Sequence, residues 1–300
     1  MKINWTLKIG LYMFAFLLFI AILGPYLPFI DGKLQQDKYR IDEERNITLP
    51  PYERSWKNLL GSDRQGVDQL SKIVVGAKDT ISIVFAIVLV RYAIAVPLGL
   101  LAYKRRGPFH LLLSGWNQVF SSLPTIFAAV LLMNLPFLLL RDDRLAWVIF
   151  ILASIEVGRV AYIVQQQAGK LSNEPFVEAG TALGNNQFGL IKRYYLPHLY
   201  PEIVVNFCID LSKTMLLLGQ LGILSIFLTQ EWVQQFGGAM LLTDTGNNWT
   251  NLLAQHRGDI LRNNFSFIFY PVYAIMFVIL TFNILGEGLK KHYNKRINAN

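Results

Sequence analysis

Charged residues are scarce in this sequence. Asp, Glu, Lys and Arg make up 16% of its 300 residues, whereas they make up about a quarter of an ordinary soluble domain. The few charges also gather in short segments, and long uncharged stretches separate them. This distribution argues against a large soluble domain and is typical of an integral membrane protein.

Residue types that catalysis and metal binding require are also sparse. The one cysteine, Cys208, permits no intrachain disulfide, and its apolar neighbours predict a buried thiol. The four histidines are scattered and form no metal-binding pattern. The nucleotide-binding pattern G-x-x-x-x-G-K-[ST] is absent, because AGKLS at 168–172 lacks its upstream glycine and its final Ser or Thr. We therefore expect no catalytic residue, no metal and no cofactor, and we expect that the protein is not an enzyme.

The net charge of +8 does not point to nucleic acid, because the basic residues flank apolar stretches, where they set membrane topology. Membrane lipid is the expected surrounding. The first apolar stretch, 9–30, has no charge over 22 residues, and a signal-peptide core has only about 7–15. We interpret it as a retained membrane span.

Six stretches reach the length of about 20 mostly apolar residues that a spanning helix needs. The third is long enough to contain a bend, which Pro124 or Pro136 would cause, and an interfacial start near Phe109–Trp116. The fourth and fifth contain charges. The six predicted spans are 9–30, 80–103, a span within 107–140, 145–167, 201–228 and 263–286.

Loop charges assign the sides of the membrane. With the N-terminus in the cytoplasm, the inner segments hold 12 Lys and Arg residues and 3 acidic residues, and the outer loops hold 13 basic and 14 acidic residues. This asymmetry follows the positive-inside rule and predicts that both termini are cytoplasmic. The inner segments are 2–8, 104–112, 165–199 and 287–300, and the outer loops are 31–79, 141–144 and 229–262.

The inner segment between the fourth and fifth spans has a helical pattern although it is too polar to span. Ser172 or Asn173 is a suitable N-cap, and Phe176, Ala179 and Leu183 recur at i, i+3 and i+7 on one apolar face. Gly184 is a suitable stop, and a second helical piece is expected over about 187–196. The pattern alone fits an element that docks on another protein as well as a helix lying on lipid headgroups.

The same segment resembles a known family. Glu178-Ala179-Gly180, then Gly184, then Tyr194-Tyr195-Leu196-Pro197 follow the signature E-A-A-x3-G-x9-I-x-L-P of bacterial ABC importer permeases. Two positions depart from it, since Gly180 replaces the second Ala and Tyr194 replaces Ile.

Further blocks resemble the C-type inner-membrane subunit of the oligopeptide, dipeptide and nickel permeases. LLGSDRQGVDQLSKIVVGAK at 59–78 is similar to that family's entry to the second span, with Val67 in place of the usual Arg. The other blocks, in family order, are VPLGLLA at 96–102, SSLPTIFAAVLL at 121–132, NNWTNLLA at 247–254 and FNILGEGLK at 282–290. Residues 229–246 match no block of the family.

The resemblance implies an all-α membrane protein of the type I-like importer fold, with six transmembrane helices and a cytoplasmic coupling helix. It implies a permease subunit in the bacterial inner membrane that forms half of a path, most simply for peptides. Implied partners are a second permease, two ATP-binding subunits and an extracytoplasmic substrate-binding protein. The implied organisation is 1–30 for the first tip and span, 31–79 for an outer loop, 80–290 for the core, with a coupling segment at 172–197, and 291–300 for a tail.

The resemblance also assigns roles to residues. In this family the coupling helix docks into a groove on the ATPase, and the matching residues here are Phe176, Glu178, Ala179, Gly180, Leu183, Gly184, Leu196 and Pro197. In the outer loop, Asp63 and Asp68 would cap helices or contact the binding protein, within a turn that also contains Gly61 and Gly66.

Five charges fall in or near the spans and are costly if they face lipid. Asp210 and Lys213 stand at i, i+3, as do Glu156 and Arg159, so each pair can neutralise itself on one helix face. The charges either line the path or the interface with a second permease, or form local ion pairs that let the helices insert. The set is Arg91, Glu156, Arg159, Asp210 and Lys213.

An alternative function is a six-span secondary transporter or channel that works without an ATPase. Co-purification with an ATP-binding subunit would distinguish it from an importer subunit.

Overall fold

A computed structural model describes residues 4–41, 47–139, 141, 143–234, 240–243, 246–258 and 266–297. The described residues form two compact units. Unit one lies within Met1–Leu11, Val84–Leu217 and Thr281–Asn300, and unit two lies within Tyr12–Ile83 and Leu218–Leu280.

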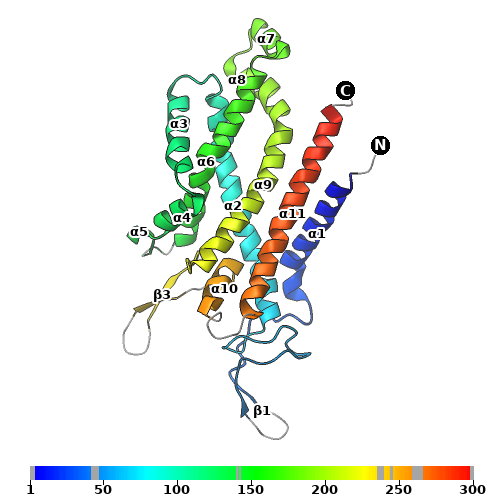
Figure 1. Ribbon diagram of the computed structural model, residues 1–300, viewed down its shortest axis with the longest axis vertical. Coiled ribbons are helices and arrows are strands. Elements are labelled where there is room, and N and C mark those ends of the chain that lie inside the picture. The colour runs from blue at the N-terminus through cyan, green and yellow to red at the C-terminus, as the bar shows by residue number, and fades with distance from the viewer. Residues whose placement is uncertain are drawn as a thin grey trace. The chain divides into compact units, whose positions relative to one another are not determined.

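Helices dominate the fold (Figure 1). The long helices are α1 (Trp5–Leu23), α2 (Gln69–Leu101), α3 (Pro108–Ser121), α6 (Arg144–Leu171), α9 (Leu196–Ile223) and α11 (Ser266–Ile297). The shorter ones are η1 (Gly24–Tyr26), α4 (Thr125–Met133), α5 (Pro136–Leu139), α7 (Pro175–Ala182), α8 (Gln187–Leu190), the π-helical turn η2 (Ile191–Tyr195) and α10 (Trp249–His256).

Two short antiparallel hairpins are the exception to the predicted all-α fold. One pairs β1 (Arg40–Ile41) with β2 (Ile47–Thr48), and the other pairs β3 (Glu231–Gln234) with β4 (Met240–Thr243). The second hairpin falls in the stretch that resembled no block of the family. The charged and turn residues of this stretch show no helical periodicity. Each strand has only four residues, so the alternation that would predict a strand is not clear either.

Four helices in the described part of the chain are long and apolar enough to cross a membrane, and a bent pair adds a fifth candidate. The pair consists of α3 and α4, which meet at 94°. Pro124 precedes α4 as its N-cap, so the bend falls at one of the two predicted prolines. Helix α9 is 28 residues long but is not among these candidates, so the count of six remains a prediction. The four are Trp5–Tyr26, Gln69–Leu101, Arg144–Leu171 and Phe267–Asn294.

Helix boundaries differ from the predicted spans where charges are satisfied locally. Helix α2 begins at Gln69, inside the segment predicted to be an outer loop. Lys72 in its first turns is buried against Asp63, so its charge did not mark a loop. Helix α11 continues to Ile297, into the predicted tail, because its last turns carry exposed Lys and Glu side chains that suit a solvated helix.

In unit one, α3 runs antiparallel beside α6. The Trp116 indole donates to the Ser154 carbonyl at 2.9 Å, and the Gln165 amide lies 3.0 Å from a His110 ring nitrogen. The start of α3 therefore lies along a span candidate, and an interfacial position for Phe109–Trp116 stays a prediction. The ends of the chain also meet in this unit, where the Asn4 amide donates to the Gly288 carbonyl at 2.8 Å.

In unit two, α10 is held by hydrogen bonds to its neighbours. The Trp249 amide donates to the Thr80 hydroxyl at 2.9 Å, and its indole donates to the Ile73 carbonyl at 2.8 Å. The Asn251 side chain accepts from the Leu228 amide at 3.1 Å. These bonds fix α10 to α2 and to the segment that follows α9.

Candidate functional site

The segment that resembles the family signature forms two helical pieces around a glycine turn, at the end of unit one where α6 stops (Figure 1). Helix α7 begins at Pro175 with Glu174 as its N-cap residue, so neither Ser172 nor Asn173 caps it as predicted. Gly184 ends the turn with φ +80°, a conformation that glycine adopts without strain. Asn186 then caps α8 by accepting from the Gly189 amide at 2.8 Å.

The second helical piece does not stop before the next span. Helix α8, the π-turn η2 and α9 follow one another without a break, and Pro197 is the second residue of α9. Proline has no amide hydrogen to donate to the preceding turn, and a π-turn widens the helix where that bond is missing. The His198 ring nitrogen donates to the Tyr194 carbonyl at 2.7 Å at the same place. Helix α8 is therefore continuous with α9.

The inner face of the segment is fixed to three long helices. Val177 is 3% exposed and Tyr195 is 1% exposed, and both belong to one buried apolar cluster. Burial and the neighbouring Tyr103 hydroxyl raise the pKa of Tyr195 above its ordinary value, so this phenol stays protonated. We call the cluster the coupling core; it comprises Leu100 and Tyr103 at the end of α2, Val164 and Ala168 of α6, Val177, Leu190 and Tyr195 of the segment, and Leu199 of α9.

Phe176 belongs to this inner side and not to the exposed face. Its ring stacks on the His198 ring at 4.6 Å and lies 6.4 Å from the Tyr194 ring. The predicted stripe of Phe176, Ala179 and Leu183 is therefore divided, because only the last two are exposed. Phe176 and Leu183 stand at i and i+7, but the helix between them is short and has a turn at each end, so the two side chains have different surroundings. The helical periodicity of the sequence does not reveal this difference.

The two departures from the family signature contact each other. A methyl group at Gly180 would lie 2.8 Å from Cζ and 2.9 Å from Cε2 of Tyr194. Side-chain carbons do not approach so closely, so the absence of a side chain at position 180 makes room for the ring at position 194. The glycine and the tyrosine thus form a compensating pair, although in the sequence they are two separate departures from the signature.

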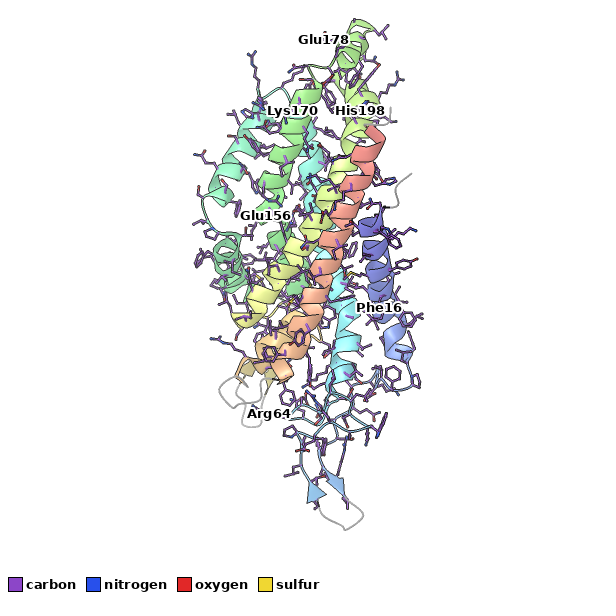
Figure 2. The ribbon with its side chains drawn as sticks, turned by 45° about the vertical axis from the view of Figure 1, so that its right-hand side comes forward. Phe16, Arg64, Glu156, Lys170, Glu178 and His198 are labelled. Carbon is purple, nitrogen blue, oxygen red and sulfur yellow. The ribbon has the colours of Figure 1, made fainter. Side chains whose placement is uncertain are left out.

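The outer face ends in two large exposed apolar side chains. Leu183 is 80% exposed and Phe188 is 73% exposed; we call these two residues the tip. Glu178 is exposed on α7, whose C-cap residue is Leu183, at the far end of unit one (Figure 2). Leu196 and Pro197 are exposed at the start of α9. Sequence reasoning missed Phe188, although an aromatic residue directly after three polar residues, Asn185, Asn186 and Gln187, is a recognisable signal of a contact surface.

Four of the five intramembrane charges lie close together within unit one, and three of them are joined directly by ion pairs. Arg159 of α6 pairs with Glu156 on its own helix and with Asp210 of α9, at 2.7 Å in the second case. The Tyr92 hydroxyl of α2 donates to the other Asp210 oxygen at 3.0 Å, and the Thr125 hydroxyl donates to Glu156 at 2.7 Å. Figure 2 shows Glu156 midway along α6.

Arg91 completes the network beside these carboxylates. Its side chain is 1% exposed, and it donates to the Leu152 carbonyl of α6 at 3.3 Å. Two cations and two carboxylates thus lie on α2, α6 and α9, and the attraction of Asp210 and Glu156 for Arg91 offsets part of the cost of burying its charge. This arrangement fits the interpretation that these four charges stabilise the helix bundle.

Lys213 stands apart from the network. The predicted pair of Asp210 with Lys213 is not formed, because Asp210 turns to Arg159 on another helix. Lys213 is exposed on α9 and has no ion pair within the described residues. It is the member of the set that still fits a path or a partner interface.

The outer turn in unit two consists of residues that satisfy one another. Asp68 caps α2 by accepting from the Ser71 amide at 2.8 Å. Asp63 is 3% exposed, accepts from the Gln65 and Val67 amides at 2.8 and 2.9 Å, and pairs with Lys72. Of the two predicted roles for these aspartates, their geometry favours the structural one.

Both glycines of the turn have φ +81°. A side chain at Gly66 would overlap the Asp37 carbonyl oxygen, and one at Gly61 would lie 3.0 Å from the Tyr52 carbonyl oxygen. Lys57 and Arg40 hold the pKa of the Asp37 carboxyl below its ordinary value. The turn is therefore closely packed on the preceding loop.

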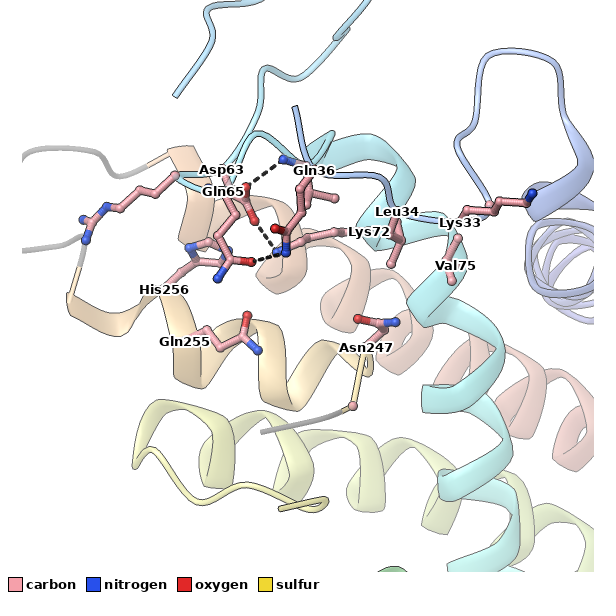
Figure 3. Close-up of a pocket in the computed structure, with 14 residues that line it drawn as sticks. Lys33, Leu34, Gln36, Asp63, Gln65, Lys72, Val75, Asn247, Gln255 and His256 are labelled. Atoms are coloured by element: carbon pink, nitrogen blue, oxygen red, sulfur yellow. Dashed lines mark hydrogen bonds and ion pairs between the residues drawn. The ribbon is translucent and has the colours of Figure 1, made fainter. Parts of the chain in front are cut away.

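A polar pocket of about 470 Å³ lies beside this turn (Figure 3). The Gln36 amide donates to Gln65 at 3.3 Å on one side, and Gln255 and His256 of α10 form the other side. The buried ion pair of Asp63 and Lys72 also lines this pocket. No group of three or more His, Cys, Asp or Glu residues suited to a metal occurs in the described parts of the chain.

Comparison with known proteins identifies this kind of molecule. Residues 95–299 match the family described as the inner membrane component of binding-protein-dependent transport systems. The match covers more than half of the chain, and the chain belongs to this family. It is therefore a membrane-embedded permease, a transport subunit and not an enzyme, that works with an ATPase and a substrate-binding protein.

Individual relatives are similar over almost the whole chain. The dipeptide transport system permease protein DppC of Bacillus subtilis is 22% identical over 97% of this chain and 82% of its own length. The DppC protein of Haemophilus influenzae is 24% identical over 96% of this chain and 90% of its own. The glutathione transport system permease protein GsiD of Pectobacterium atrosepticum is 24% identical over 97% and 86%.

Proposed function

We propose that this chain forms half of the translocation path of an ATP-driven importer for dipeptides or short oligopeptides. Its path partner is a second, different permease subunit, and two ATP-binding subunits drive it. The names of the similar dipeptide and glutathione permeases support peptides as the substrate class.

The coupling segment carries the proposal. Its inner face is part of the coupling core, which joins it to α2, α6 and α9, while its tip exposes Leu183 and Phe188. An exposed apolar tip on a rigid base suits insertion into a groove on another protein. ATP-driven movement of that groove would displace three long helices together, because the coupling core cannot deform without losing its packing.

The proposed orientation places the coupling segment and both termini in the cytoplasm. The Asn4 contact with Gly288 supports a common side for the two termini. The surplus of Lys and Arg in the inner segments supports the cytoplasmic assignment. Six spans, with α9 as the fifth, complete this topology.

A double substitution at the tip tests the proposal. Leu183→Ser with Phe188→Ser is expected to leave the protein in the membrane and to reduce its retention of the ATP-binding subunits at least tenfold, since truncating a hot-spot side chain costs about 2 kcal/mol or more. Uptake of a labelled dipeptide into vesicles containing the reconstituted complex should fall in parallel.

The matched control removes two exposed apolar side chains from the outer loop of unit two. Trp56 is 97% exposed and Leu59 is 46% exposed. Trp56→Ser with Leu59→Ser should retain the ATP-binding subunits. Full retention and full uptake by the tip variant would refute the docking role. A self-sufficient secondary transporter would show the same independence from an ATPase, but no contact in the described residues favours that function.

A further inference from the structure

A second feature of unit one lies beside the coupling core and has a different chemistry. The turn that follows α2 and the last turn of α6 enclose a pocket of about 570 Å³. Four of its lining residues are cations, and none of the described lining residues is acidic. Lys170 marks the α6 side of the pocket (Figure 2). The lining cations are Lys104, Arg105, Arg106 and Lys170.

These charges are not neutralised by the protein. None of the four cations forms an ion pair within the described residues; Arg105 donates to the neutral Gln166 amide oxygen, and Lys104 lies 5.6 Å from the Tyr103 ring centre. The C-termini of α2 and α6 each contribute about half a negative charge. Two such termini offset about one of the four positive charges, so a surplus of about three remains in one pocket.

The backbone at the pocket is also strained. Arg105 has φ +53°, a left-handed conformation that costs an ordinary residue about 1–2 kcal/mol. The chain therefore holds a cation in a turn where glycine would be easier to accommodate. Strain of this kind is commonly retained where a residue has a functional contact.

The pocket lies where two membrane-spanning candidates end. Helices α2 and α6 are both long and apolar enough to cross a membrane, and the pocket is built from the residues that follow or complete their C-terminal ends. Apolar side chains on either side of the basic turn are exposed, namely Leu101 at 38% and Phe109 at 46%. The phosphate of a lipid bound at this site would meet the cations, and its acyl chains would meet the exposed apolar side chains.

We propose that this pocket binds the headgroup of an anionic phospholipid. Lys104, Arg106 and Lys170 supply charge, while Ser172 and Asn173 supply neutral hydrogen-bonding groups. Tyr103 and Ser172 also line the neighbouring pocket against α7. The bound lipid thus lies against the base of the coupling segment, and its presence stabilises the arrangement of α2, α6 and α7.

Native mass spectrometry of the full-length protein in detergent tests this site with short-chain phosphatidylglycerol as the probe. Phosphatidylcholine and inorganic phosphate serve as comparison ligands. The triple variant Lys104→Gln, Arg106→Gln, Lys170→Gln should bind phosphatidylglycerol at least about tenfold more weakly than the natural chain. The control Lys8→Gln, Lys290→Gln, Lys291→Gln removes the same formal charge from the ends of α1 and α11 and should bind as the natural chain does.

Arg105→Gly separates binding from folding. It removes one cation and the left-handed strain together, so phosphatidylglycerol binding should weaken while the melting temperature stays level or rises. Equal binding by the triple variant and the natural chain would overturn the proposal. So would equal binding of phosphatidylcholine, equal competition by inorganic phosphate, or loss of ATP-binding subunits from the triple variant with unchanged lipid binding.

Discussion

The coupling segment and the outer turn both resemble blocks of the permease family, but their residues are arranged in opposite ways. In the outer turn, Asp63 is buried and paired, and Asp68 caps its own helix. In the coupling segment, Val177 and Tyr195 are buried, while Leu183 and Phe188 extend outward without apolar cover. A family motif can thus correspond to a buried, internally paired turn in one place and to an exposed apolar tip in another.

The largest effect expected from this difference is at the glycines. Gly66 and Gly184 have nearly the same φ, +81° and +80°, but only Gly66 is crowded, against the Asp37 carbonyl. Gly66→Ala should therefore destabilise the protein by about 4 kcal/mol or more. Gly184→Ala meets no atom within 4 Å and should cost only the left-handed strain of about 1–2 kcal/mol. Melting temperatures of the two purified variants in detergent measure the difference; similar values would remove the contrast.

Among its described residues, unit one contains a paired charge, Arg159, and an unpaired one, Lys213, and removing them should change the stability by different amounts. Arg159→Leu leaves Glu156 and Asp210 without their shared cation and should destabilise the protein by about 3 kcal/mol. This is the low end for a broken buried pair, because the Arg159 side chain is 34% exposed. Lys213→Leu is the control. It should leave the stability within about 0.5 kcal/mol, as expected for an exposed side chain without a partner. A stable Arg159→Leu variant would mean that the network contributes little to folding.

The smallest effect concerns the compensating pair in the coupling segment. Gly180→Ala should destabilise the protein by about 1–3 kcal/mol, because the new methyl group meets the Tyr194 ring. Tyr194→Ile, which restores the family residue, should make the same alanine tolerable. A double-mutant cycle on melting temperature should give a coupling of about 0.5–3 kcal/mol. Additive effects would show that the two departures from the signature are independent.

Much of the fold followed from elementary patterns in the sequence. Uncharged stretches located the long helices, and the bend between α3 and α4 falls at Pro124, one of the two prolines predicted to cause it. The predicted second span begins after Lys78 and Asp79, whereas α2 begins at Gln69 and carries both of these charges. The first turns of α2 also hold Lys72, whose charge is paired with Asp63 in the turn before the helix. A hydropathy pattern does not reveal such a pair, so the sequence alone did not show that the helix extends beyond the apolar stretch.

The candidate site was predicted in part. The glycine turn at Gly184 and the helix before it follow from local conformational preferences. The division of the stripe at Phe176 does not, because it depends on stacking against His198 of the next helix. Likewise, Asp210 pairs with Arg159 and not with Lys213, its predicted partner. This choice depends on how three helices pack.

The proposed docking requires Leu183 to insert into an ATP-binding subunit on the cytoplasmic side. A photo-crosslinking amino acid placed at position 183 in intact cells tests it directly, with the same group at the exposed outer residue Trp56 as the comparison. Irradiation should join position 183, and not position 56, to the ATP-binding subunit. The account would be contradicted if position 183 joined only lipid, or if an impermeant reagent outside the cell reached it.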